Sequence, residues 1–330
     1  MATNTVSTGD FEPVVIAAKR DTRPALMMVG PAIILLIIFV LIPFIMAGWL
    51  SLHRVNLNSP LPSKWIGFEQ YRRILFDSAT RGDFLRGLLN NFVFALIVVP
   101  LQTGLALGLA MLLNRPLRGM AIFRTFFFMP VVFPMALVAV IWKLIYSRDS
   151  IGLLNSFIDT VTFGQVGPID WLGDPKYAMA SIILLSIWQG VGFQMIIILA
   201  GLQGISPSLY EAASIDKAGR WEQFRNVTLP GLRNTLIFVS MVTTIFAFRL
   251  FDQVYILTEG GPNNATTTVM YQAVSSAFGS GTRASGNVGK AAAITVVFFV
   301  IVVLITIIQR RVLREAVSYT HLTLPTSDLV

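Results

Sequence analysis

Six long stretches of this chain carry few charges, and they limit its possible folds more than any other feature. They cover residues 24–50, 88–113, 122–146, 177–202, 232–257 and 288–308. Each holds roughly 20 or more residues, enough for a helix to cross the hydrocarbon core of a bilayer. A segment in lipid must satisfy its own backbone hydrogen bonds, which favours a helix in each stretch. The sequence therefore predicts an all-α membrane protein with six transmembrane helices.

The composition supports this class and excludes others. Of 330 residues, 55% are hydrophobic and 13% are charged, whereas about a quarter of the residues in a soluble domain are charged. The formal charge is +8, but the basic residues are scattered between apolar runs, as beside lipid head groups, so we expect no nucleic-acid partner. The chain has no cysteine and two histidines, His53 and His321. These lie in a loop and in the tail, so no metal site is expected.

The basic residues also indicate how the chain is oriented. Three of them precede the first stretch, which is too long for a signal peptide and is read as an uncleaved span. Others gather in "NRPLRGMAIFR", in residues 217–233 and in "QRRVLR". The opposite loop 51–87 is basic too, but long loops count less in this rule. We therefore expect the segment 1–23, the loop 203–231 and the C-terminus to be cytoplasmic.

The chain is read as one transmembrane domain over residues 24–314, followed by a tail. Residues 315–330 come after the basic stop and include "SYTHLTLPTSDLV", which has no hydrophobic face. A disordered tail and a foreign, non-native extension are both open interpretations. The tail is left out of the fold prediction.

A polar segment, "LYEAASIDKAGRWEQFRNVTLPG", separates the fourth and fifth stretches. Ser206 and Pro207 predict a helix start, because serine caps free N–H groups and proline suits the first helical position. Ser208 and Glu211 have the spacing of a capping box. A glycine, Gly219, then permits a turn before a second amphipathic piece. The segment is predicted to form two short helices joined at a bend.

Two interpretations of this segment remain open on physical grounds. It is either an ordinary helix on the membrane surface or a docking element for a cytoplasmic partner. Helices that bind anionic lipid are mostly basic, whereas this segment mixes both charge signs. Mixed charge favours the docking interpretation.

The same segment resembles the "EAA" signature of binding-protein-dependent ABC importer permeases. That pattern is Glu-Ala-Ala, three residues, Gly, nine residues and Ile-x-Leu-Pro. This chain has Glu211-Ala212-Ala213 and later Val227-Thr228-Leu229-Pro230 at that spacing, but Lys217 stands at the glycine. The departure leaves the position of the bend open between Lys217 and Gly219.

Further stretches resemble the carbohydrate-uptake subclass, in particular the first permease subunit of the maltose and glycerol-3-phosphate type. They are "FDQVYILTEGGPNNATTT", "WIGFEQYRRIL", "LNRPLRGMAIFRTFFFMP" and "WQGVGFQMIIILAGLQGISPSLYEAA". The resemblance implies a type I ABC importer permease fold with a cytoplasmic coupling helix between helices 4 and 5. It also implies a place in a bacterial or archaeal cytoplasmic membrane, where the chain translocates a sugar, a related polyol or glycerol-3-phosphate by alternating access.

The resemblance implies partners as well. They are a second homologous permease subunit, a dimer of ATPase subunits, an extracytoplasmic solute-binding protein, the sugar and membrane lipid. ATP and Mg would be used by the ATPase subunits, so the chain is expected to be a transport subunit without its own cofactor, and not an enzyme. The residues that the signature places at the ATPase contact are Glu211, Ala212, Ala213, Asp216, Lys217 and Gly219.

The resemblance also implies a substrate pathway on the fourth and fifth stretches. Its residues are Ser186, Gln189, Gly190, Phe193, Phe248, Arg249 and Asp252. Amide, guanidinium and carboxylate groups suit hydroxyls, and aromatic faces suit C–H surfaces. The maltose-type pattern has uncharged amides where Arg249 and Asp252 stand, which leaves room for a ligand other than maltose. The alternative is that these two neutralise each other, three residues apart on one helix.

The remaining polar residues and the function allow other interpretations. Gln194 is expected to bond to a neighbouring helix, and Asn90-Asn91 to cap the second span. An ABC permease for a non-sugar solute is an alternative function, against which "TEGGP" argues. A stand-alone secondary transporter is another, but it would need several buried carboxylates, and Asp252 alone offers itself.

Overall fold

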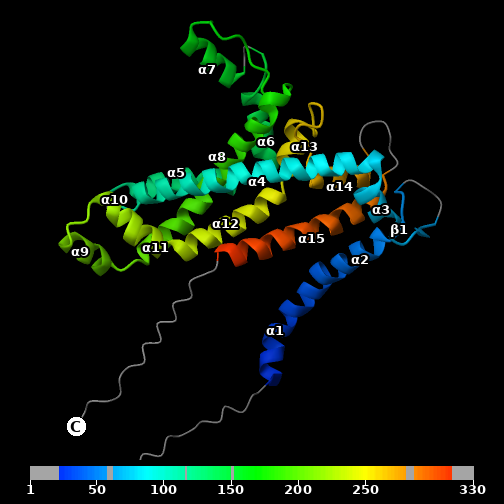
Figure 1. Cartoon of the computed structure of the whole chain (residues 1–330), viewed down its shortest axis with the longest axis horizontal. Helices are drawn as coiled ribbons and strands as arrows, with labels where there is room; N and C mark the ends of the chain where they lie inside the picture. Colours follow the sequence, from blue (N-terminus) through cyan, green and yellow to red (C-terminus); the bar gives the residue numbers. More distant parts are fainter. Residues whose placement is uncertain (1–21, 58–61, 116, 150–151, 280–285, 314–330) are drawn as a thin grey trace, which may run out of the picture. The chain divides into compact units, whose positions relative to one another are not determined.

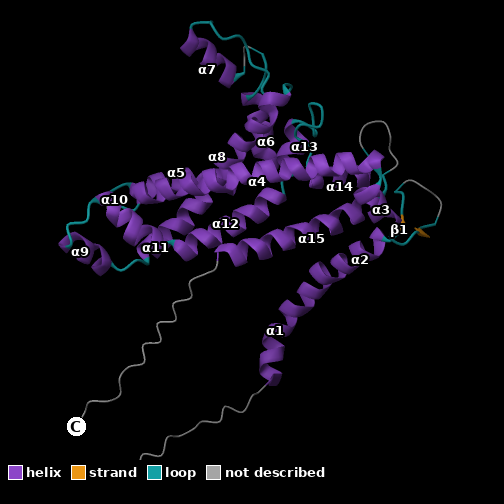
Figure 2. Cartoon of the chain, viewed as in Figure 1, coloured by secondary structure: helices purple, strands orange, loops and turns teal. Residues whose placement is uncertain are grey.

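The computed structural model describes residues 22–57, 62–115, 117–149, 152–279 and 286–313. The predictions for the tail 315–330, and for the N-terminal segment before residue 22, therefore lie outside the described residues. The described chain is mainly helical, with one short strand pair between the first helices (Figure 2). The all-α prediction is confirmed.

The chain divides into two units, of which the first is residues 1–47. It holds α1 (Thr22–Leu36), a π-helical turn η1 (Ile37–Leu41) and most of α2 (Ile42–Ser51). Met27–Ser51 forms a helical stretch of 25 residues that is long and apolar enough to span a membrane. This stretch corresponds to the first predicted span.

The second unit, residues 48–330, holds the remaining described elements. They are β1 (His53–Arg54), β2 (Lys64–Trp65), α3 (Glu69–Phe76), α4 (Ser78–Leu113), α5 (Met120–Val132), α6 (Met135–Ile145), α7 (Leu153–Thr162), α8 (Pro175–Gln203), the short loop helices α9 to α11, α12 (Arg233–Phe248), α13 (Asp252–Leu257), α14 (Val269–Phe278) and α15 (Val288–Leu313). The strands pair antiparallel, with His53 opposite Trp65. In Figure 1, α4, α12 and α15 run alongside one another. Within the described ranges, five helices could span a membrane, or six if α5 and α6 count as one bent span.

The packed core of this unit is centred on α4 and α8. Phe94 and Val98 on α4 and Ile182 and Leu185 on α8 are all buried in one cluster. Further along, Ala106 on α4 belongs to a second cluster with residues of α8 and α12. Small residues at such contacts let the helix backbones approach closely, as is usual in membrane proteins.

The second span begins earlier than predicted. Helix α4 starts at Ser78, ten residues before the expected start at residue 88. The carboxylate of Asp77 caps it by accepting a hydrogen bond from the Ala79 N–H at 3.1 Å. Hydropathy marks where a helix becomes apolar, and a capped helix can begin well before that point.

The third predicted span is not a straight helix. Helices α5 and α6 meet at an angle of 98°. The break lies at Phe133-Pro134, where Phe133 is extended with ψ 140°. Proline lacks an N–H and disfavours the helical conformation of the preceding residue, so the sequence "VVFPMA" ends one helix and begins another. The stretch predicted as the third span, residues 122–146, thus consists of two helices, which count as one span if the bent pair crosses the membrane together.

The fifth predicted span is also interrupted. Helix α12 ends at Phe248 and α13 begins at Asp252. The hydroxyl of Thr268 donates to the freed carbonyl of Leu250 at 2.9 Å, which satisfies one of the exposed ends. The ion-pair alternative assumed that Arg249 and Asp252 lie on one continuous helix. The break between α12 and α13 separates them instead.

Asn91 joins α4 to the end of α12, beside this break, and to the start of α14. Its side chain is fully buried. Its Oδ1 accepts from the Val269 N–H at 3.0 Å, and its Nδ2 donates to the Phe248 carbonyl at 3.4 Å. The prediction that Asn90 and Asn91 cap the second span is wrong, because α4 begins at Ser78.

We expect Asn91→Leu to destabilise the folded chain by about 2 to 4 kcal/mol, since it leaves a buried N–H and a buried carbonyl without their partner. Thermal unfolding of the detergent-solubilised protein measures this. Asn90→Leu is the matched control, because Asn90 is only partly buried and bonds to the loop carbonyls of Asn264 and Thr267. An equal loss of stability in the two variants would contradict the assigned role of Asn91.

Candidate functional site

The polar segment folds as two short helical pieces, as predicted. The first is α9 (Pro207–Ile215), with Ser206 before it and proline at its first turn. The second is continuous through α10 (Arg220–Gln223), the π-helical turn η2 (Phe224–Thr228) and α11 (Leu229–Gly231). The predicted capping box of Ser208 and Glu211 is not formed. Instead the hydroxyls of Ser206 and Ser208 bond to each other at 2.8 Å.

The bend between the two pieces lies at Lys217. This residue has φ 57°, in the left-handed region that favours glycine. The Ala218 N–H bonds back to the Ala213 carbonyl at 2.9 Å and closes the end of α9. Gly219 has an ordinary negative φ and precedes α10, with its N–H held by the Glu222 carboxylate at 2.7 Å. The chain thus bends where the family pattern has glycine, although lysine stands there.

Side-chain hydrogen bonds tie the two pieces into one rigid element. The hydroxyls of Tyr210 and Thr228 bond at 3.0 Å. The Gln223 amide donates to the Ser214 hydroxyl at 3.1 Å and to the Ala218 carbonyl at 3.2 Å. The predicted contact residues Glu211, Ala212, Asp216, Lys217 and Gly219 are exposed, and Ala213 is half-buried. These bonds join α9 to the helical piece that leads into α12.

We expect Lys217→Gly to keep coupling intact and to stabilise the loop by up to about 1 kcal/mol, because glycine adopts the left-handed conformation without strain. A β-branched residue resists this conformation, so Lys217→Val should destabilise by a similar amount or more. Thermal unfolding and ATPase stimulation of the assembled transporter check both variants. A more stable Lys217→Val protein would contradict the observed position of the bend.

A cavity of about 340 Å³ lies among α4, the α5–α6 break, α8 and the α12–α13 break. Six of the seven predicted pathway residues line it, namely Ser186, Gln189, Gly190, Phe193, Arg249 and Asp252. Phe248 does not. Its ring is 1% exposed and packs edge-on against Phe92 at 5.3 Å between ring centres. Phe246 lines the cavity instead.

Both helix breaks contribute to the cavity wall. Met135, the first residue of α6, and Asp252, the first of α13, are lining residues. The Gln189 amide donates to the freed carbonyl of Phe133 at 3.2 Å and so holds the first break. Broken helices beside a polar cavity are a common way for transporters to present backbone and side-chain groups to a solute.

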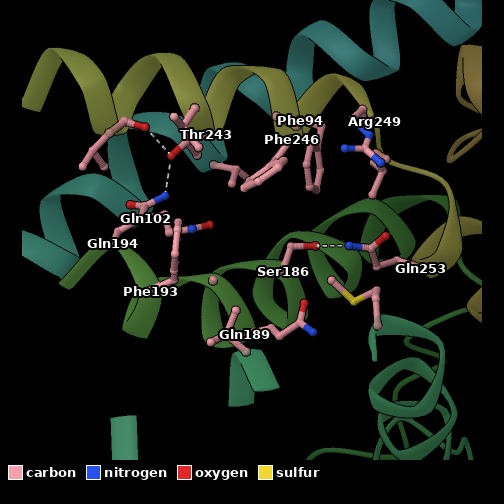
Figure 3. Close-up of a pocket in the computed structure, with 18 of the residues that line it drawn as sticks. Phe94, Gln102, Ser186, Gln189, Phe193, Gln194, Thr243, Phe246, Arg249 and Gln253 are labelled. Carbon is pink, nitrogen blue, oxygen red and sulfur yellow. Dashed lines mark hydrogen bonds between the residues drawn. The ribbon is translucent and has the colours of Figure 1, made fainter. Parts of the chain in front are cut away.

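The polar side chains of the cavity are partly bonded to one another (Figure 3). The Gln253 amide donates to the Ser186 hydroxyl at 3.4 Å. The Gln194 amide donates to the Thr243 hydroxyl at 2.5 Å, which confirms that Gln194 bonds to a neighbouring helix. Gln102 lines the same cavity, and within the described residues its side chain makes no hydrogen bond. The cavity therefore offers both fixed and unused amide groups.

The two charged residues of the cavity are separated. The described residues form ion pairs at Arg73–Glu69 and Arg148–Asp170, and none between Arg249 and Asp252 within 4.0 Å. Both side chains are exposed to the cavity side of the break. The break explains this, because it removes the helical spacing that would have paired them. Figure 3 shows Arg249 beside the chain that leaves α12.

Sequence reasoning missed Gln102, Phe94 and Phe246 as lining residues. Gln102 had a usable signal, because a lone amide in the middle of an apolar span is costly and is often functional. Gly190 makes room for it, since a Cβ at Gly190 would overlap the Gln102 amide. Phe94 and Phe246 had no such signal among so many apolar residues. In the described part of the chain, no three His, Cys, Asp or Glu side chains gather as a metal site would require.

The structure is that of a helical membrane protein with an exposed two-helix loop between α8 and α12 and a cavity at the two helix breaks. Residues 78–316 match the family of binding-protein-dependent transport system inner membrane components. The chain belongs to this family, whose members are transport components of ABC importers. It is therefore an inner-membrane permease subunit and not an enzyme.

Curated relatives cover nearly the whole chain. The trehalose/maltose transport system permease protein MalF of Thermococcus litoralis is 33% identical over 89% of this chain and 95% of its own. The lactose transport system permease protein LacF of Rhizobium radiobacter is 33% identical over 88% and 93%. The sulfoquinovosyl glycerol transport system permease protein SmoG of Agrobacterium fabrum is 32% identical over 89% and 91%.

Solved structures agree on the fold. A chain of a bacterial ABC transporter that imports the acidic polysaccharide alginate matches with a TM-score of 0.72 at 21% identity. The match covers 89% of this chain and 96% of that one. The ABC importer permease fold predicted from the sequence is thereby confirmed.

Proposed function

We propose that this chain is the permease subunit through which an ATP-driven importer passes a sugar, or a related polyol, across the inner membrane. The observation that carries the proposal is the cavity at the two helix breaks. It combines amides, two hydroxyls and one charge of each sign with three aromatic rings, Phe94, Phe193 and Phe246. Sugars offer many hydroxyls on a ring with apolar faces, and such a lining matches both.

Relatives support this solute class. Three of them are named for trehalose and maltose, for lactose and for sulfoquinovosyl glycerol. Two of these three names denote neutral sugars, and the third contains a sulfonated sugar. The unpaired guanidinium of Arg249 gives this chain a group that could serve an acidic polyol, glycerol-3-phosphate included, as well as a neutral one.

The coupling loop would dock on one of two ATPase subunits, which use ATP and Mg. Glu211, Ala212, Ala213, Asp216, Lys217 and Gly219 form the proposed contact. ATP-driven closure of the ATPases would move the rigid loop and, through α8 and α12, the two breaks beside the cavity. Alternating access follows when the cavity opens to one side and then to the other.

The remaining partners are a second homologous permease subunit and an extracytoplasmic solute-binding protein. The family description names binding-protein dependence, and one similar structure is of an alginate transporter in complex with a substrate-bound periplasmic protein. Both chain ends and the coupling loop are proposed to be cytoplasmic. In this orientation the Thr258–Thr268 loop faces the binding protein.

The test is uptake of labelled sugar by the complete importer in proteoliposomes, with Asp252→Ala in this subunit. Removing a charged hydrogen-bonding group should lower uptake about 10- to 150-fold, which corresponds to about 1.5 to 3 kcal/mol. ATPase subunits should still bind, because Asp252 is far in sequence from the coupling loop. Asp159→Ala on α7 is the control and should transport normally. Unchanged uptake in an expressed Asp252→Ala transporter would count against the cavity as the solute site.

A further inference from the structure

A second cavity of about 410 Å³ lies in the same unit and shares no lining residue with the first. Its walls come from the start of α4, the Thr258–Thr268 loop, α14 and the start of α15. Ligand sites usually have volumes of about 300 to 1,000 Å³, so this cavity is large enough for a small molecule. Neither the coupling loop nor the first cavity accounts for it.

The lining is unusual for a protein with so few charges. Four charged side chains meet here, Asp83 and Arg86 on α4, Glu259 in the loop and Lys290 on α15. Among the described residues none of the four forms an ion pair within 4.0 Å. Lys290 is half-buried and still has no counterion. Asp83, Arg86 and Glu259 are exposed, and Arg86 donates to the Asn263 carbonyl at 3.4 Å. Of the four, only the partly buried Lys290 carries a desolvation cost that a bound polar group would offset.

The walls of this cavity are fixed in place by hydrogen bonds. The Gln272 amide donates to the Asp83 carbonyl at 2.5 Å and joins α14 to α4. The Thr267 hydroxyl donates to the Gly260 carbonyl at 2.9 Å and closes the loop on itself. Gly260 has φ 80°, and a Cβ there would come within 2.7 Å of the Tyr271 ring. These contacts fix the backbone that carries the cavity wall.

Tyr271 adds an aromatic surface and a donor. Burial and the neighbouring Glu259 carboxylate raise the pKa of Tyr271, so its hydroxyl stays protonated. Hydroxyls and amides complete the lining at Thr80, Asn264, Thr267, Gln272, Ser275 and Ser276. Charged groups, hydroxyls and amides therefore line the same cavity as one tyrosine ring.

This lining selects against most ligand classes. A lipid chain would bury four charges in an apolar contact. A simple anion would meet Asp83 and Glu259, and a simple cation would meet Arg86 and Lys290. A neutral molecule with many hydroxyls suits all of them, since each hydroxyl both donates and accepts a hydrogen bond.

We propose that this second cavity is a separate binding site for a sugar ring or similar polyol, occupied before the solute reaches the first cavity. Asp252 at the start of α13 lines the first cavity, and Glu259, just past its end, lines the second. The six residues of α13 rise about 9 Å, a short step for a solute. The proposal rests on the proposed function for the solute class and for the side of the membrane.

The experiment uses the absence of cysteine from the chain. Ser276→Cys places a single thiol in the second cavity, Ser186→Cys places one in the first, and Ser156→Cys on exposed α7 is the control. The assembled importer in nanodiscs is treated with a small methanethiosulfonate reagent, with and without maltose, trehalose or lactose. Intact mass spectrometry of this subunit counts the modified fraction, so cysteines of partner subunits do not interfere.

The expected result is that at least one of these sugars slows modification of the Ser276→Cys thiol. Protection should reach about tenfold when the sugar is at about ten times its Kd. It should persist with Gln189→Ala in the first cavity and disappear with Glu259→Gln and Lys290→Gln combined. The Ser156→Cys thiol should react at the same rate throughout.

Three results would overturn the proposal. If sugar protects the Ser186→Cys thiol alone, the second site is wrong while the proposed function stands. If Gln189→Ala removes protection of the Ser276→Cys thiol, that protection came from the first cavity through a change of conformation. Absence of protection at both thiols, for every sugar tested, would count against the proposed solute class and the second site together.

Discussion

Replacing Glu211 by lysine together with Ala213 by glutamate will abolish ATP-driven uptake while leaving the helices inserted in the membrane. The double change reverses one charge and puts a large charged side chain where a small half-buried one packs. Disrupting the centre of a docking contact costs at least about 2 kcal/mol, which is about a 30-fold loss of affinity for the ATPase subunit. Uptake should therefore fall to the level of vesicles without ATP.

Copurification of the ATPase subunits and protease mapping of the inserted chain separate the two parts of this prediction. A matched control is Gln165→Lys together with Val166→Glu, in the exposed loop between α7 and α8. It makes similar changes away from the coupling loop and should leave uptake unchanged. Normal uptake in the Glu211→Lys, Ala213→Glu transporter would show that α9 does not dock.

Gly192→Ala is expected to destabilise the protein by about 3 kcal/mol or more. A Cβ at Gly192 on α8 would overlap the backbone carbonyl of Phe127 on α5. Backbone cannot move aside as a side-chain tip can, so α5 must shift or the two helices must separate. Because α5 ends at one of the two breaks, the shift should also distort the first cavity.

Thermal unfolding in detergent and the yield of assembled transporter measure this effect. Gly104→Ala is the control, since Gly104 lies within α4 and nothing lies within 4 Å of the position of its Cβ. Alanine has the higher helix propensity, so this variant should be neutral or up to about 1 kcal/mol more stable. Equal behaviour of the two alanine variants would contradict the close α5–α8 contact.

Some features of this structure have a clear physical signal in the sequence and could be predicted from it, and others do not. Apolar length predicted the spans, and the signature predicted the coupling loop. The sequence indicates the two helix breaks less clearly than it indicates the spans. Pro134 marked the first, but the break at Arg249 has no proline or glycine, and it depends on bonds from Thr268 and Asn91, far away in the sequence.

The residues that line the first cavity could also be predicted only in part. Phe246 and Phe248 are both in "FAF", and each helical residue turns by about 100°, so the two rings point to nearly opposite faces. Phe246 therefore lies in the cavity wall, whereas Phe248 lies on the other face of the same helix. Gln102 was missed because it lies on α4, whereas the resemblance carried residues of the fourth and fifth spans alone. Lys217 stands at the glycine of the pattern and adopts its conformation, which propensity alone would not predict.

Sugar uptake by the complete importer in proteoliposomes, with the energy source varied, tests most directly whether this chain is an ATP-driven permease subunit. We expect uptake to require ATP together with the ATPase subunits and the solute-binding protein. Asp252→Ala and the Glu211→Lys, Ala213→Glu pair should each abolish most of it. Sugar uptake by this chain driven by an ion gradient, without ATPase subunits, would show that it is a secondary transporter instead.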